Sequence, residues 1–312
     1  MLRHPGNHLG DAWFYTEGNI CHCFYLTCPL SEERHTCWDI AHATSEDMVH
    51  WQLHGLVIEK GGNGEWDQTC LSTGTILKRG EWYWMAYTGK WDDIPAKVGL
   101  ARSRDLYHWE KCPHNPVGWP DGNYYAVCGS GARKFSHWRD PFLMEHEDSV
   151  YMLTCATNAS AQQDASGTVG VMRTTDMIHW EYVSPPQIEE VCQELECPQV
   201  FHLNGKYILL FSSYQMLFSQ KLQTEAGNQL RQTSYYMVSD HIWGPYRFIR
   251  DYHLLPDQLP DPCANEQYAN RLVQFHGKTW ILGTVWSENG DYIADPREVT
   301  FDPSKCCLNT QK

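Results

Sequence analysis

Thr44-Ser-Glu-Asp-Met-Val-His-Trp51 is the first of four related segments in the chain. The others are Arg102-Ser-Arg-Asp-Leu-Tyr-His-Trp109, Arg173-Thr-Thr-Asp-Met-Ile-His-Trp180 and Met237-Val-Ser-Asp-His-Ile-Trp243. Their spacing of about 60 residues is typical of an array in which one small supersecondary unit is repeated.

Each of these segments carries an Asp and a Trp at matching positions. The Asp is expected to cap a turn and the Trp to wedge between neighbouring units, and both roles are structural. We therefore assign no catalytic role to the repeated acids Asp47, Asp105, Asp176 and Asp240.

Strand-like runs precede the repeated segments. The clearest are Gly18–Leu26, Gly80–Tyr87, Asp148–Thr154 and Gly205–Phe211, and Gly277–Gly283 is a fifth. Alternating apolar residues between Gly and Asn turns are typical of antiparallel strands, and no segment of 12 or more residues sustains a helical stripe. The pattern predicts an all-β fold, a five-bladed β-propeller of four-stranded units, because radial closure hides strand edges. We expect a single domain over residues 1–312, with blades near 10–58, 67–115, 138–185, 195–250 and 265–302.

The charge balance excludes some classes of partner. Lys and Arg number 24 against 38 Asp and Glu, which gives a formal net charge of −14. Phosphate groups need clustered cations, so we expect neither nucleic acid nor an anionic membrane as a partner. The chain contains 14 Trp, 17 Tyr and 10 Phe, and aromatic residues are frequent in β-strands. Their flat apolar faces can also stack on the C–H groups of a sugar, so we expect a small saccharide as the partner. The sequence leaves open whether the chain forms a homo-oligomer.

The context of the 13 cysteines favours structural thiols over disulfides or a metal site. The start of the chain lacks the apolar core of a signal peptide, and no run of about 18 apolar residues would span a bilayer. We therefore expect a cytoplasmic protein with reduced thiols. Cys21-His22-Cys23 alternates like a strand, which would place the sulfurs on one face and the imidazole on the other. No metal and no cofactor is expected.

Three acids stand outside the repeated segments, near the openings of blades. Asp11 belongs to the first blade, Asp140 opens the third and Glu196 opens the fourth. A propeller brings the early strand of every blade to one axial funnel, so we expect these side chains to converge. Repulsion among them would raise one pKa and leave another carboxyl ionised. Glycoside cleavage needs such a pair, one acid to protonate the leaving oxygen and one carboxylate to attack or to activate water.

The chain resembles family 32 of the glycoside hydrolases in several short stretches of sequence, which occur in the same order as in the family. This family comprises β-fructofuranosidases, including invertases and fructan hydrolases, and is related to family 43. The matching stretches are His42–Trp51, Thr73-Gly-Thr with the following Ala86–Gly89, Trp138-Arg-Asp-Pro-Phe142 and Glu196-Cys-Pro198. The Arg-Asp-Pro and Glu-Cys-Pro elements discriminate best, because family 43 more often has Gly after the acid.

The resemblance implies a role for each acid. Asp11 would be the nucleophile and Glu196 the general acid and then base. Asp140 would hold ring hydroxyls and stabilise the transition state, with Arg139 neutralising local charge. Asp11 and Glu196 should then lie about 5–5.5 Å apart, as in retaining enzymes. Further candidates for substrate contact in the funnel are Asp39, His42, Trp66, Asp67, Thr73, His137, Trp138 and Trp286.

Two departures from the family pattern leave the substrate open. Family 32 usually has Asn-Asp-Pro-Asn-Gly where this chain has Gly10-Asp11-Ala12-Trp13, as a divergent branch of the family does, and no C-terminal β-sandwich is expected. The leading hypothesis is a retaining hydrolase of a small β-fructoside. An inverting arabinofuranosidase similar to family 43, a glycosyl-transfer enzyme and a non-catalytic sugar-binding propeller stay open as alternatives.

Overall fold

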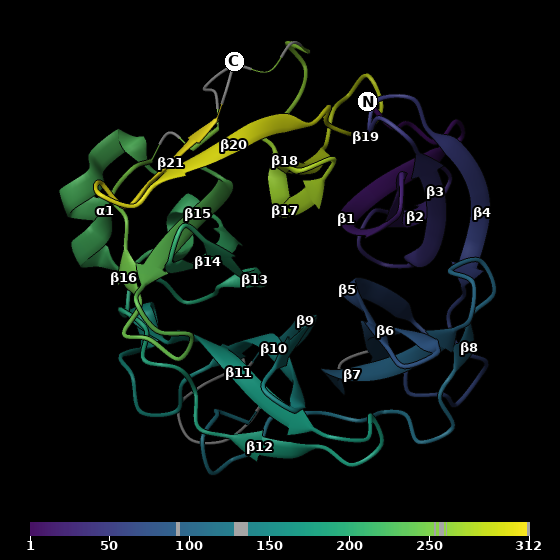
Figure 1. Ribbon diagram of the computed structural model, residues 1–312, viewed down its shortest axis with the longest axis horizontal. Coiled ribbons are helices and arrows are strands. Elements are labelled where there is room, and N and C mark those ends of the chain that lie inside the picture. The colour runs from purple at the N-terminus through teal and green to yellow at the C-terminus, as the bar shows by residue number, and fades with distance from the viewer. Residues whose placement is uncertain (92–93, 128–136, 253, 256–258, 260, 311–312) are drawn as a thin grey trace.

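Five antiparallel sheets surround one axis and form a five-bladed β-propeller (Figure 1). The computed structural model describes residues 1–91, 94–127, 137–252, 254–255, 259 and 261–310. The all-β fold and the five blades predicted from the repeated segments are confirmed.

Each of the first four blades is a meander in which consecutive strands pair. The first blade contains β1 (Asn7–Glu17), β2 (Ile20–Pro29), β3 (Asp39–Ser45) and β4 (Gln52–Ile58). The second contains β5 (Cys70–Arg79), β6 (Trp82–Trp91), β7 (Ile94–Ser103) and β8 (Glu110–Lys111). The third contains β9 (Trp138–His146), β10 (Ser149–Thr157), β11 (Gly167–Thr174) and β12 (Glu181–Val183). The fourth contains β13 (Glu196–Leu203), β14 (Lys206–Ser213), β15 (Thr233–Ser239) and β16 (Arg247–Phe248).

The fifth blade contains β17 (Tyr268–Phe275), β18 (Lys278–Val285), β20 (Arg297–Asp302) and β21 (Cys307–Thr310), and β19 (Tyr292–Ile293) also pairs with β18. This blade runs past residue 302, where the repeat pattern placed its end. A turn at Asp302, whose carbonyl accepts the N–H of Lys305 at 3.3 Å, reverses the chain and lets β21 pair with β20.

Helical structure is sparse among the described residues. It consists of α1 (Gln220–Ala226) and 3-10 turns at Gln163–Ala165, Gln215–Leu217 and Gly227–Gln229. None of these segments has the length and apolar character needed to cross a membrane.

The innermost strands β1, β5, β9, β13 and β17 line the axis, and each contains a β-bulge (Figure 1). The pairing register breaks at Leu9/Ala12, Ser72/Gly74, Arg139/Phe142, Glu196/Gln199 and Tyr268/Arg271. A bulge leaves residues unpaired and re-aims their side chains. The unpaired residues include Asp11, Thr73, Asp140 and Cys197, so the same irregularity in four blades positions side chains at the axis.

The repeated segments form capped turns, as predicted, in three blades. One carboxylate oxygen of Asp176 accepts the N–H groups of Ile178 and His179, both at 2.8 Å, and the other lies 2.7 Å from the His179 ring. Asp47 and Asp105 make the same contacts with His50 and His108. These hydrogen bonds explain why the Asp and the His recur together.

The prediction that Asp240 caps the fourth turn is wrong. This copy is one residue shorter, and its turn uses the Ser239 hydroxyl, which accepts the N–H of His241 at 3.0 Å. The Asp240 carboxylate instead pairs with Lys206. The predicted packing of the repeated Trp residues between blades is confirmed, since the Trp109 ring lies 5.7 Å from that of Phe24 in the preceding blade.

Asp176→Ala is expected to lower the free energy of unfolding by about 1–2 kcal/mol, because two backbone N–H groups lose their acceptor. Asp240→Ala is the matched control and should destabilise the fold less, since the carboxylate of Asp240 pairs with the side chain of Lys206 and does not cap its turn. Urea unfolding of both variants measures the difference. Equal destabilisation would contradict the capping role of the repeated Asp.

Candidate functional site

A cavity of about 120 Å³ opens on the axis where the innermost strands begin. The three carboxylates of Asp11, Asp140 and Glu196, from β1, β9 and β13, all line it. Its other lining residues are Gly10, Leu26, His35, Trp38, Ser72, Lys90, Arg139, Tyr214, Tyr268 and Trp286. Acids more than 180 residues apart in the sequence therefore share one site.

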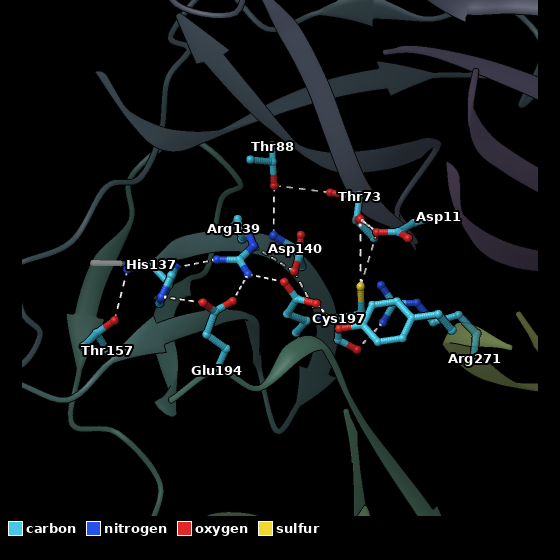
Figure 2. Close-up of polar contacts among 12 residues, drawn as sticks. Asp11, Thr73, Thr88, His137, Arg139, Asp140, Thr157, Glu194, Cys197 and Arg271 are labelled. Atoms are coloured by element: carbon cyan, nitrogen blue, oxygen red, sulfur yellow. Dashed lines mark hydrogen bonds and ion pairs between the residues drawn. The ribbon is translucent and has the colours of Figure 1, made fainter. Parts of the chain in front are cut away.

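Asp11 stands at the bulge of β1 and contacts side chains of the second and fourth blades (Figure 2). Its Oδ2 accepts the hydroxyl of Thr73 and the thiol of Cys197, the latter at 3.5 Å. The preceding residue must be glycine, because a Cβ on Gly10 would lie 2.9 Å from the Cβ of Leu26. Burial and then the charge of Asp140 raise the pKa of Asp11, while the hydrogen bond from Thr73 opposes them.

Asp140 is buried and held from two sides (Figure 2). Its backbone has a φ of 58° at the bulge of β9, and its N–H donates to the Thr88 hydroxyl at 2.8 Å. The carboxylate accepts the N–H of Cys197 at 3.1 Å and lies 3.5 Å from the Nε of Arg139. A left-handed φ on a non-glycine residue is strained, and here these contacts hold it in place.

Glu196 shares Arg139 with a second acid, Glu194. One guanidinium nitrogen contacts both carboxylates, and the Tyr268 hydroxyl donates to the other oxygen of Glu196. Burial raises the pKa of Glu196 to about 7. The charge of Arg139 opposes this shift, and the charges of Glu194 and Asp140 add to it.

Glu194 is held in its ionised form by the same group of residues. Burial acts to raise its pKa, but the hydrogen bond from His137 and the charge of Arg139 bring it below the ordinary glutamate value. The His137 Nε2 lies 3.1 Å from Glu194, and its Nδ1 accepts from Arg139 at 2.6 Å. The pKa of Glu196 is thus raised, whereas that of Glu194 is lowered. Such a pair can supply one carboxylic acid that donates a proton and one carboxylate that stays ionised.

Aromatic rings close one side of the cavity. Trp286 is buried and donates from Nε1 to the Leu9 carbonyl at 3.0 Å. Its ring lies 5.7 Å from that of Tyr268 and 5.5 Å from that of His35. Such a wall offers apolar faces to the C–H groups of a sugar, while the carboxylates opposite accept its hydroxyls.

Of the residues proposed from sequence for substrate contact, Arg139 and Trp286 line the cavity, and Thr73 and His137 contact its lining residues Asp11 and Arg139. Two acidic candidates lie outside the cavity lining. Asp39 accepts the N–H of Lys60 at 2.7 Å and pairs with its ammonium at 3.0 Å. Asp67 is buried against Lys111 at 2.7 Å and the Tyr87 hydroxyl at 3.1 Å. Both carboxylates join strands within a blade.

Three further candidates also lie outside the lining because they pack inside blades. His42 is fully buried, with its ring 4.4 Å from that of Phe24. Trp66 lies against glycines of β6 and β7. Trp138 is buried with its ring 5.1 Å from that of Tyr125, so it offers no face to the cavity.

Sequence reasoning missed several residues of the site. Glu194 could have been found, because it stands two positions before Glu196. Residues two positions apart in an extended chain point to the same face. Tyr268, Lys90 and His35 carry no such signal, since they come from separate elements. The role of Cys197 was hidden in the Glu-Cys-Pro element, where only the acid was assigned a function.

Within the part of the chain that the structure describes, no group of three His, Cys, Asp or Glu side chains is arranged to hold a metal ion. Cys21 and Cys23 are buried in the core, while His22 faces the His42 ring at 5.1 Å, which is the alternation predicted for this strand.

Comparisons with known proteins point to one family. The model of the glycosyl hydrolases family 32 N-terminal domain matches residues 11–295. Sucrose-6-phosphate hydrolase of Escherichia coli is 26% identical over 217 residues, which cover 66% of this chain and 41% of that protein. A probable sucrose-6-phosphate hydrolase of Psychromonas ingrahamii is 23% identical over 308 residues, with 88% and 52% covered. The chain thus spans about half the length, or less, of these curated relatives.

Among solved structures, inulosucrase from Halalkalicoccus jeotgali bound to kestose superposes with a TM-score of 0.76 at 21% sequence identity. The match covers 98% of this chain and 87% of that one. The likeness shows that the two chains share the five-bladed propeller fold.

Proposed function

We propose, since the chain belongs to family 32 of the glycosyl hydrolases, that it hydrolyses a β-fructofuranoside with retention of configuration. The observation that carries the proposal is the cavity in which Asp11, Asp140 and Glu196 meet. A non-catalytic sugar-binding propeller would have no need for a buried carboxyl whose pKa is raised to about 7.

In the first step, Asp11 attacks the anomeric carbon while Glu196 donates its proton to the leaving oxygen. The raised pKa of Glu196 supports this role, because the group is protonated up to neutral pH. The hydrogen bonds from Thr73 and Cys197 to Asp11 favour its ionised form, which the attack requires.

In the second step, Glu196 acts as the base. It takes a proton from water, which attacks the fructosyl–Asp11 ester and releases fructose. Asp140, fixed by the N–H of Cys197, is oriented to accept hydroxyl groups of the ring. Arg139 keeps Glu196 in place through both steps, because it is itself anchored by Glu194 and His137.

The substrate proposed is a small β-fructoside. A cavity of about 120 Å³ suits a single sugar ring, so the aglycone would extend toward solvent. Incubation with sucrose, sucrose 6-phosphate and kestose, followed by detection of released fructose, tests the activity. Methanolysis with NMR of the product tests the stereochemistry. Retention supports the proposal, whereas inversion would favour the arrangement with carboxyls about 6.5–9.5 Å apart.

The value of kcat/KM is expected to fall at alkaline pH as Glu196 loses its proton. Glu196 is protonated below its pKa of about 7, so the rate should drop by about tenfold per pH unit above that value. On the acid side, the limb should lie above the ordinary aspartate range, because burial and the charge of Asp140 raise the pKa of Asp11. A steady-state profile between pH 4 and 9 measures both limbs, and a flat profile through neutrality would contradict the assignment of Glu196.

A further inference from the structure

A pair of cysteines stands at the mouth of the loop that joins β2 to β3. The last paired residues of these strands are Thr27 and Asp39. Cys28 directly follows Thr27, whereas Cys37 stands two positions before Asp39, with Trp38 between them. Both side chains pack in the same hydrophobic cluster, and the thiol of Cys28 contacts that of Cys37, so the two sulfurs lie close together.

The loop between these cysteines, together with the residue that follows Cys37, forms part of the cavity wall. His35 and Trp38 line the cavity, and their rings lie 5.6 Å apart. Arg34 ties the same loop to the fifth blade through a contact of 2.9 Å with Asp291. A change in the span between Cys28 and Cys37 is therefore transmitted to the position of His35.

The two thiols differ in access. Cys37 is partly exposed, whereas Cys28 is only 1% exposed. Burial, and then the contact with Cys37, raise the pKa of Cys28 to about 12, so this thiol stays protonated. Lys60 places a positive charge beside the pair, since its ammonium donates to the Cys37 carbonyl at 3.0 Å. An accessible thiol next to a cation and a second thiol is the arrangement of a reversible redox site.

We propose that Cys28 and Cys37 are a redox pair that peroxide converts into a disulfide. Peroxide first oxidises the Cys37 thiol to a sulfenic acid and leaves as one water molecule. The Cys28 thiol then attacks the sulfenic sulfur, the S–S bond forms, and the sulfenic hydroxyl leaves as a second water. Two thiols and one hydrogen peroxide thus give one disulfide and two waters, and a dithiol reductant reverses the change.

The disulfide alters the wall of the cavity. An S–S bond of about 2.05 Å is shorter than a hydrogen-bond contact between sulfurs, so its formation draws the ends of the loop together. Displacement of His35 and Trp38 is expected to lower turnover by about tenfold or more. This effect on rate rests on the proposed function, whereas formation of the disulfide does not.

Tryptic digestion tests the cross-link directly. Cleavage after Arg34 separates residues 4–34, which contain Cys28, from residues 35–60, whose only cysteine is Cys37. Folded protein treated with hydrogen peroxide, blocked with an alkylating agent and digested without reductant should yield the two peptides joined, with fragment ions that assign Cys28. Separate peptides, or a joined pair that uses another cysteine, would overturn the proposal.

Cys37→Ser should abolish both the joined peptides and the loss of turnover in peroxide, and dithiothreitol should restore the wild-type protein. Cys263→Ser, which removes an exposed cysteine away from the loop, is the matched control and should respond as the wild type does. Equal inactivation of Cys37→Ser would contradict the link to the cavity. If the untreated protein turns over no fructoside, the proposed function fails, and the cross-link is still decided by the peptides.

Discussion

Asp11→Asn is expected to lower kcat by at least about 10⁴-fold, because an amide cannot attack the anomeric carbon and form the fructosyl ester. The fold should remain intact, since asparagine is isosteric and can still accept the Thr73 hydroxyl. Removal of the negative charge also relieves repulsion with Asp140, which is one cause of the raised pKa of Asp11. Sugar binding measured by calorimetry should therefore survive the loss of turnover.

Asp39→Asn is the matched control for this substitution. Asp39 belongs to the same blade but lies outside the cavity lining and pairs with Lys60. Its variant should keep turnover within a fewfold of the wild type. A comparable loss in both variants would point to a general defect of the first blade, and full activity of Asp11→Asn would end the assignment of the nucleophile.

Glu196→Gln is expected to lower kcat by about 10²–10⁴-fold for substrates with a poor leaving group, the usual contribution of general acid catalysis. A β-fructoside with an activated leaving group needs no proton in the first step, so its cleavage should suffer less. The second step still lacks its base, and the covalent intermediate should accumulate. Single-turnover kinetics would show a burst of leaving group followed by a slow phase.

Glu189→Gln controls for the loss of a glutamate charge in the same region of the chain. Glu189 contacts Arg250 at 3.0 Å and has no part in the cavity. The variant should keep the pH profile of the wild type, whereas Glu196→Gln should lose the alkaline limb near pH 7. An alkaline limb that persists unchanged in Glu196→Gln would mean that another group carries the proton.

The fold could be predicted from sequence because its signal is repeated. In three of the four segments the Asp caps the same turn, and the repeated Trp packs between blades, so one pattern recurs along the chain. The pattern failed at Asp240, where the segment is one residue shorter and lacks the paired His. A local change in turn length was thus enough to remove the Asp cap, while the hydroxyl cap of Ser239 matches those of Ser45, Ser103 and Thr174 in the other turns.

The three acids of the site could be found because they depart from the repeat, but their neighbours could not. Strict strand alternation puts Trp138 on the face of Asp140 and Arg139 on the opposite face. The bulge of β9 instead lets Arg139 and Asp140 both line the cavity, while Trp138 packs on Tyr125. Bulges carry no clear sequence signal, so the side on which such residues lie had to come from the structure.

The most direct test of the account is to locate the covalent intermediate. Glu196→Gln protein is mixed with an activated β-fructofuranoside, quenched in acid, digested and analysed by mass spectrometry. We predict one added fructosyl group on the peptide of residues 4–34, with fragment ions that place it on Asp11. A fructosyl group on any other residue, or cleavage with inversion and no adduct, would contradict the central claim that Asp11 is the nucleophile.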